Sequence, residues 1–143
     1  MNWQELPELD KQLVIQECYR MVAYHFDRML QARSGNLKLA EDLQQQAFRT
    51  CQAAIQHLGF PLTAEGGAGY GERVPWIQCE PGLQEMVVST LLNYQEKWFR
   101  DSIRAGEQDL PKRQLRAIAL RKAFRAAIVE LGYENTKMAC GEL

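Results

Sequence analysis

The sequence predicts an all-α protein, a four-helix bundle built from two helical hairpins. Apolar residues recur at helical spacing in four separate stretches, and glycine or proline interrupts the chain between them. A glycine- and proline-rich segment, residues 59–80, divides the second stretch from the third and is expected to be a long loop. At 143 residues the chain is expected to form a single helical domain.

The first helix is expected at about residues 7–32, where Pro7 suits a first helical position. Gly35 is expected to take a left-handed conformation after it, and Asn36 to cap the next helix. The apolar stripe of the first helix consists of Ile15, Cys18, Val22, Phe26 and Met29.

The second helix is expected at about residues 37–58. Gly59 ends it, and Pro61 prevents it from resuming. Its predicted core stripe consists of Leu39, Leu43, Ala47, Cys51, Ala54 and Leu58, with Phe48 and Ile55 beside it.

The stretch from Gly59 to Gly82 holds six of the ten glycines and three of the five prolines. It lacks the Gly-Lys-Ser/Thr of a phosphate-binding loop and the strand–helix context of a dinucleotide fingerprint. Residues 74–77 are expected to pack on the bundle and to pair with residues 60–63 as a short hairpin. Arg and aromatic side chains here are candidate partner contacts, namely Tyr70, Arg73 and Trp76. The alternative is a solvated connector whose Trp76 packs into the bundle.

The third and fourth helices are expected at about residues 81–105 and 111–131, with Asp109 or Leu110 as the cap of the fourth. Residues 135–143 are expected to be a loosely held tail. The fourth helix is apolar on two sides, which predicts a central position or a partner interface and suggests a homodimer. Its main stripe is Ala117, Leu120, Phe124, Ile128 and Leu131, and its second row is Leu115, Ile118 and Val129.

The fourth helix is also basic, because residues 110–129 contain six Lys or Arg and no acid. On a helical wheel these charges scatter around the cylinder, whereas a nucleic-acid stripe would be one-sided. The alternatives are a solvated face and a surface for an anionic partner. The candidate contact residues are Arg113, Arg116, Arg121 and Arg125.

The sequence contains a hint of internal duplication. Residues 53–60, Ala-Ala-Ile-Gln-His-Leu-Gly-Phe, resemble residues 126–133, Ala-Ala-Ile-Val-Glu-Leu-Gly-Tyr, at an offset of 73. Phe26 and Phe99 are also 73 residues apart. The alternative is that alanine-rich helices commonly end in Leu-Gly, since glycine is favoured just after a helix.

The composition narrows the classes of function. The formal net charge of −1 gives no overall attraction to nucleic acid or membrane. The N-terminal residues lack the apolar run of a signal peptide, so we expect a cytoplasmic protein without membrane contact. Four separated cysteines are expected to be reduced thiols, and Cys79, near the start of the third helix, is a minor candidate for a reactive one. Two histidines without ligand spacing predict no metal site, and no cofactor is expected.

One short motif resembles a known family. Residues 20–25, Arg-Met-Val-Ala-Tyr-His, resemble the Arg-x4-His signature of HEPN ribonucleases, which are all-helical. The resemblance implies Arg20 and His25 as a catalytic pair. In this chain Met21 follows the arginine where the family usually has a polar residue, and the motif lies on the first helix.

The sequence therefore favours a small regulatory or assembly module that acts by protein–protein interaction without catalysis. Its partner would be another protein, or a second copy in a homodimer. An RNA- or DNA-binding subunit is the alternative, and a ribonuclease using Arg20 and His25 is a second one.

Overall fold

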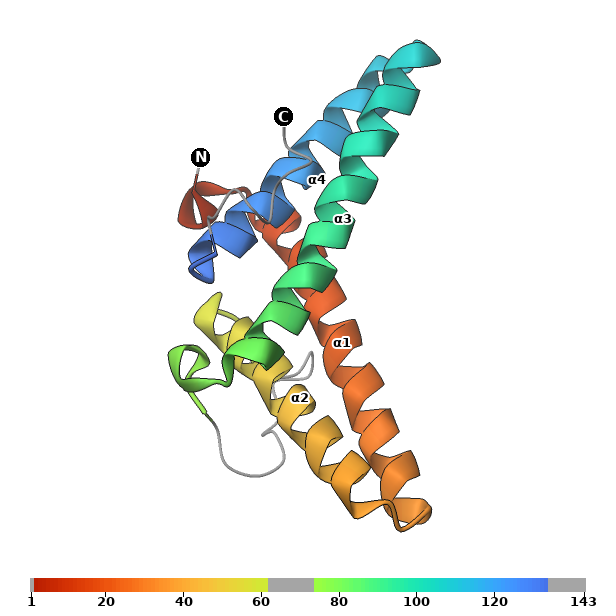
Figure 1. The fold of residues 1–143 in the computed structure, drawn as a ribbon. Coiled ribbons are helices and arrows are strands. Elements are labelled where there is room, and N and C mark those ends of the chain that lie inside the picture. The colour runs from red at the N-terminus through yellow and green to blue at the C-terminus, as the bar shows by residue number, and fades with distance from the viewer. Residues whose placement is uncertain (1, 62–73, 134–143) are drawn as a thin grey trace. The chain divides into compact units, whose positions relative to one another are not determined.

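The computed structural model describes residues 2–61 and 74–133, and it confirms an all-α fold (Figure 1). These residues form four α-helices and two short 3₁₀ helices, each 3₁₀ helix preceding a pair of α-helices, and no strand occurs among them. The elements in order are η1 (Trp3–Glu5), α1 (Glu8–Ser34), α2 (Lys38–His57), η2 (Trp76–Gln78), α3 (Pro81–Glu107) and α4 (Pro111–Glu130).

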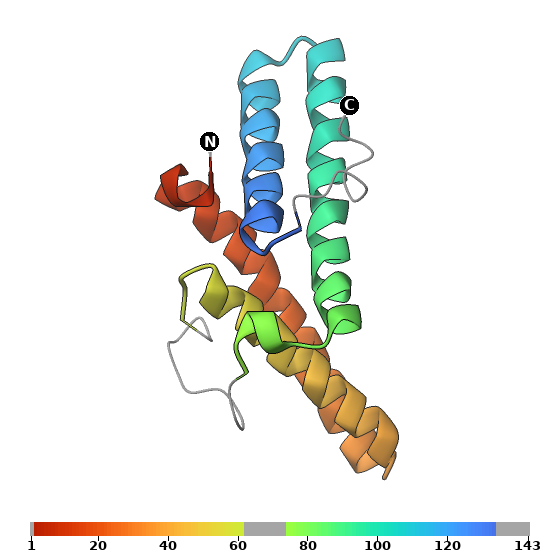
Figure 2. The ribbon, with the colours of Figure 1, turned by 60° about the vertical axis from the view of Figure 1, so that its left-hand side comes forward.

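The chain divides into two compact units, and α1 and α3 each contribute residues to both. Unit 1 comprises residues 1–14 and 88–143, and unit 2 comprises residues 15–87. In unit 1, α3 and α4 form a hairpin whose antiparallel helices lie side by side in Figures 1 and 2. In unit 2, α1 and α2 form the corresponding hairpin, with the Phe26 and Phe48 rings 5.3 Å apart.

The two halves of the chain repeat the same elements at an offset of 73 residues. Helices α1 and α3 both have 27 residues, α2 and α4 both have 20, and η1 and η2 both have three. Every corresponding pair of elements begins 73 residues apart. The structure thus supports the duplication that the sequence suggested.

The hairpin turns repeat in detail. Asn36 and Asp109 both take left-handed conformations, with φ of 57° and 55°. The next residue in each turn donates its N–H to a carbonyl five residues back, from Leu37 to Ala32 and from Leu110 to Ala105, both at 2.9 Å. The left-handed residue of the first turn is therefore Asn36, not Gly35 as predicted, and Leu37 and Leu110 occupy the N-cap positions.

The repeats exchange their first elements. Helix η1 packs on α4, the last helix of the second repeat, and η2 packs on α2, the last helix of the first repeat. The tryptophan of each 3₁₀ helix is buried, Trp3 at 1% exposure and Trp76 at 3%. Each unit is consequently built from segments of both repeats.

The predicted core is largely correct. All five residues of the main α4 stripe are buried, and so are Ala47, Cys51, Ala54 and Leu58 of α2. The prediction is wrong for Leu39 and Leu43, because these side chains at the start of α2 are 86% and 55% exposed. Their spacing suits a core stripe, but none of the elements that the structure describes buries these two side chains.

The connection between the hairpins differs from the prediction. Residues 76–78 form a 3₁₀ helix, so the expected strand over residues 74–77 is wrong. Residues 62 and 63 of its expected partner segment lie outside the described residues, as do Gly66, Gly67, Gly69 and Gly71 of the loop and the predicted tail, residues 135–143. α1 and α3 each extend two residues beyond the predicted end.

Candidate functional site

A groove of about 960 Å³ lies between α4 and the N-terminal segment of unit 1. Its base is apolar, because Trp3, Leu6 and Ala126 are all at most 8% exposed. The walls are Asn2, Pro7 and Asp10 on one side, and Leu115, Ile118, Ala119, Lys122, Arg125, Val129 and Glu130 on the other.

Local structure positions the N-terminal wall. Asn2 caps η1, accepting the N–H of Glu5 at 3.1 Å and donating its own N–H to the Glu5 carboxylate at 3.1 Å. This reciprocal arrangement satisfies two backbone donors that would otherwise lack partners. It orients the short helix that carries Trp3.

Two contacts tie this wall to α4, one near each end. Arg116 donates to Asp10 at 2.6 Å, and Asp10 is only 6% exposed. Gln4 donates to Glu130 at 3.4 Å. Gln4 thus contacts the C-terminal end of α4, whereas the later residue Asp10 contacts α4 nearer its N-terminal end. The N-terminal segment therefore runs antiparallel to the helix.

The α4 wall presents apolar side chains to solvent. Leu115 is 68% exposed and Val129 is 40% exposed, with Ile118 between them. The wall positions follow i, i+3, i+4, i+7 spacing, so they form one stripe along the helix. From residue 115 to residue 129 the stripe is about 21 Å long, at 1.5 Å per residue.

The first repeat provides an internal comparison for this stripe. The residues of α2 that correspond to Leu115, Ile118 and Val129 are Asp42, Gln45 and Gln56. The same backbone elements therefore form without an apolar stripe at these positions. The hydrophobic residues of α4 are not required by the repeated fold.

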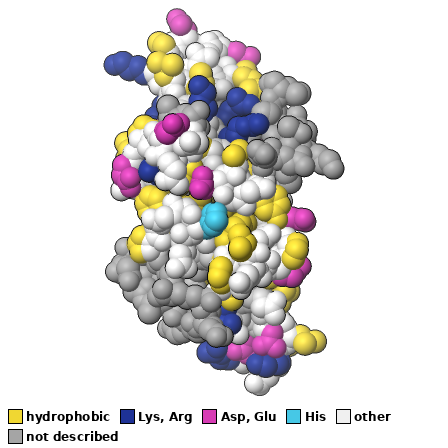
Figure 3. All heavy atoms as spheres, turned by 90° about the vertical axis from the view of Figure 1, so that its left-hand side faces the viewer, with side chains coloured by type: hydrophobic (Ala, Val, Ile, Leu, Met, Phe, Trp, Pro, Cys, Tyr) yellow, Lys and Arg dark blue, Asp and Glu magenta, His cyan; other side chains and the backbone are white. Residues whose placement is uncertain are grey.

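The basic side chains of α4 are mostly engaged within unit 1. Arg113 pairs with Asp101 at 3.7 Å, Arg116 binds Asp10, and the Arg121 guanidinium lies 4.6 Å from the centre of the Phe99 ring. Arg125 lies in the groove. The face drawn in Figure 3 shows Lys and Arg side chains gathered next to hydrophobic ones in its upper part. The four predicted contact residues thus differ in role, and only Arg125 lies in the groove.

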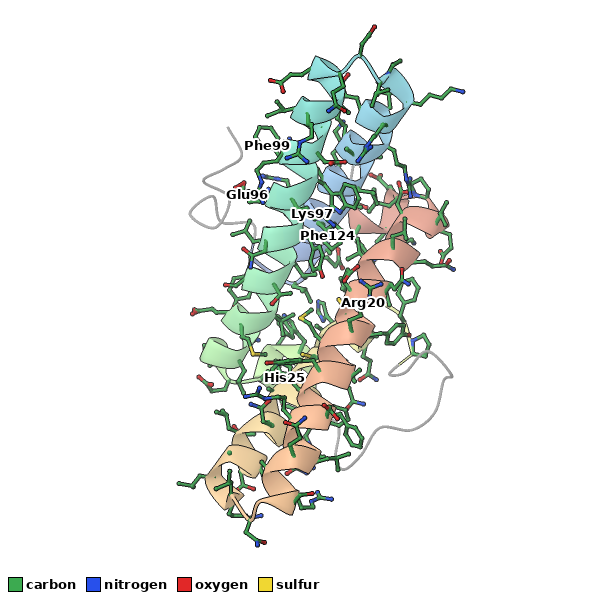
Figure 4. The ribbon with its side chains drawn as sticks, turned by 90° about the vertical axis from the view of Figure 1, so that its right-hand side faces the viewer. Arg20, His25, Glu96, Lys97, Phe99 and Phe124 are labelled. Atoms are coloured by element: carbon green, nitrogen blue, oxygen red, sulfur yellow. The ribbon has the colours of Figure 1, made fainter. Side chains whose placement is uncertain are left out.

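An aromatic cluster supports α4 away from the groove. Phe124 stacks on Tyr94 with ring centres 5.3 Å apart, and Lys97 lies 4.9 Å from the Trp98 ring centre (Figure 4). Phe124 is 2% exposed, so its ring belongs to the core. The cluster holds α3 and α4 together.

The structure separates the three predicted loop contacts. Tyr70 and Arg73 lie outside the described residues. Trp76 is buried in unit 2, and its carbonyl accepts a hydrogen bond from Gln84 at 2.7 Å. In this position its ring is a core anchor and offers no surface to a partner.

Arg20 and His25 have separate local partners. Arg20 pairs with Glu17 at 3.0 Å, and His25 Nδ1 lies 2.7 Å from the side-chain oxygen of Gln44 on α2. Residues five apart on an α-helix point about 140° away from each other. Both residues are labelled on α1 in Figure 4. The helix does not bring the pair together.

Three thiols lie inside unit 2. Burial raises the pKa of Cys18 to about 12, with a smaller contribution from Glu17, and burial also raises the pKa of Cys51 strongly. Burial raises the pKa of Cys79, although a hydrogen bond with Thr50 opposes this in part. A thiolate at the start of α3 is therefore disfavoured, and the reactive role considered for Cys79 is not supported.

Within residues 2–61 and 74–133, no group of three or more His, Cys, Asp or Glu side chains is arranged to hold a metal ion. None of the helices found there combines the length and the apolar character needed to cross a bilayer.

Sequence reasoning recognised the α4 stripe but missed the opposite wall of the groove. The signal was present, since Trp3 and Trp76 are 73 residues apart, the same offset as the helix ends. A three-residue helix has no periodicity of its own to detect.

Comparisons with known proteins add no information on this site. The chain matches no protein-family model, and searches of curated proteins and of solved structures return no match.

Proposed function

We propose that this protein is a small interaction module without catalysis, and that its contact surface is the α4 wall of the unit 1 groove. The observation that carries the proposal is the apolar stripe of exposed Leu115 and Val129 with half-buried Ile118, because the other repeat has polar residues at all three positions. Exposed apolar side chains gathered in one groove are typical of a docking surface.

The local surroundings of the catalytic candidates favour this function over the alternatives. His25 is engaged by Gln44, and the pKa values of the described cysteines are raised. The candidate arginines Arg113, Arg116 and Arg121 have contacts within unit 1, which reduces the charge available for a phosphate backbone. The loop contacts Tyr70 and Arg73 stay predictions.

Site-specific photo-crosslinking in the source cells tests the proposal. A benzophenone amino acid replaces Leu115 or Val129, and the matched controls carry it at the equivalent positions of α2, Asp42 or Gln56. We expect discrete protein adducts from the two α4 positions and none from the two α2 positions. Equal labelling at all four positions, or no adduct at either α4 position, would refute an interface at this groove.

A further inference from the structure

The groove has a distinctive pattern of charge between its two apolar ends. Lys122 lies seven residues from both Leu115 and Val129, and it has no ion pair or hydrogen bond with the rest of the described chain. Arg125 lies one turn further along the same wall. The middle of the groove is therefore positively charged.

The acidic side chains of the groove lie toward its two ends, away from Lys122. Asp10 is bound by Arg116 at 2.6 Å, at one end of the wall. Glu130 is at the other end, where it accepts a hydrogen bond from Gln4. No acid occurs in residues 110–129. Lys122 thus places an exposed positive charge between the two apolar ends.

The shape favours a helix over a small apolar ligand. A small-molecule site encloses most of its ligand. In this groove the apolar side chains at the two ends are exposed, and they follow one helix for about 21 Å. An amphipathic helix that lies in a groove uses anchors at i, i+3, i+4 and i+7 spacing.

We propose that the groove binds an acidic amphipathic helix of another protein, an inference that rests on the proposed function. The helix places apolar residues against the Leu115 and Val129 ends. Its Asp or Glu residues lie between them, against Lys122. A bound helix that matches the stripe has about 14 residues, from its 21 Å length.

The test is a selection of displayed random 16-residue peptides on the full chain, followed by binding of the selected peptides by fluorescence anisotropy. We expect enrichment of peptides with apolar residues at helical spacing and acids between them. Leu115→Gln with Val129→Gln should weaken their binding by about tenfold or more. Lys122→Glu should also weaken it, and the control Lys112→Glu, on the same helix outside the groove, should not.

The possible results separate this inference from the proposed function. Suppose that binding of the selected peptides is weakened by Leu115→Gln with Val129→Gln, but that the peptides lack acids or bind the Lys122→Glu variant equally well. That result overturns the acidic-helix inference and leaves the interaction surface standing. Peptide binding that is unchanged by Leu115→Gln with Val129→Gln, or no enrichment of any peptide, overturns both the inference and the proposed interaction surface.

Two further measurements address occupants from this protein itself. Binding that appears only after removal of residues 134–143 would make the groove an intramolecular site and overturn the inference. A dimer in sedimentation equilibrium that Leu115→Gln with Val129→Gln dissociates would make a second copy the occupant, with the same consequence.

Discussion

Among individual residues, the buried thiols make the clearest link between structure and pH. The pKa of Cys18 rises to about 12 in the folded protein, whereas an unfolded cysteine titrates near about 8.5. A group whose folded pKa is raised contributes its full stability below the unfolded pKa and loses it as the pH rises toward the folded value. Alkaline conditions should therefore weaken unit 2.

We expect Cys18 alone to account for a loss of about 2 kcal/mol in the free energy of unfolding between pH 7.5 and pH 10. Urea denaturation at both pH values, with reductant present, measures it. Cys18→Ala is less stable at pH 7.5, but it should lose about 2 kcal/mol less on going to pH 10. An equal loss in both proteins would show that ionisation of this thiol does not limit stability.

The ion pair of Asp10 and Arg116 has an apolar counterpart in the other repeat. The corresponding residues are Leu83 and Leu43. Removing one member of a buried ion pair leaves a desolvated charge, whereas replacing both with apolar residues is often tolerated. The repeat thus suggests its own substitution.

We expect Arg116→Leu to destabilise the protein by about 1–3 kcal/mol, because Asp10 is nearly buried while Arg116 is partly exposed. Asp10→Leu with Arg116→Leu should cost less than Arg116→Leu alone. Chemical denaturation of the two variants decides the point, and a double variant that is less stable than the single one would contradict it.

At the scale of single elements, the ends of α2 and α4 depend on glycine. Gly59 and Gly132 have φ of 92° and 93°, a region that side chains with a Cβ rarely adopt. In both ends the residue after glycine donates to a carbonyl five residues back, from Phe60 to Ile55 and from Tyr133 to Ile128, each at 3.1 Å. The two glycines end their helices in the same way.

We expect Gly59→Ala and Gly132→Ala each to lower the free energy of unfolding by about 1–2 kcal/mol, since the added Cβ disfavours this conformation. Gly35→Ala is the matched control, because Gly35 does not have a positive φ and its added Cβ would meet atoms only at ordinary distances. Thermal or urea unfolding reports the three values. A cost at Gly35 as large as at the other two would refute the backbone explanation.

At the scale of the molecule, the exchange of first elements makes each unit depend on both repeats. Trp3 is buried in the unit that contains the second hairpin, and Trp76 in the unit that contains the first. Neither half of the chain can complete a core by itself. A single repeat would leave the site for its missing 3₁₀ helix uncovered.

We expect separately produced fragments 1–73 and 74–143 to be poorly folded alone and to gain helical structure when mixed at equal concentration. Circular dichroism at 222 nm measures the gain, and size-exclusion chromatography shows whether a 1:1 complex forms. A 1–73 fragment carrying Trp3→Ala should complement less well, because the second hairpin lacks its buried ring. Fragments that are fully helical alone and form no complex when mixed would contradict the exchange of first elements between the repeats.

The helices could be predicted from the sequence because their causes are local. Apolar residues at helical spacing and the Gly and Pro between them placed α2, α3 and α4 within two residues at both ends. The 73-residue offset was visible as well, because equivalent helix ends need the same glycine. The apolar second row of α4 was also recognised, through the same periodicity.

The rest was decided by tertiary packing. Periodicity shows that a face is apolar, but only the surrounding elements determine whether it is covered, and this separates exposed Leu39 and Leu115 from buried Ala47 and Ala117. The groove joins residues more than 100 positions apart through η1, an element too short to carry a pattern. The sequence by itself determined four helices in two similar halves. Only the tertiary structure decided that the halves exchange their first elements, because a three-residue helix has no periodic pattern that tells which hairpin it packs on.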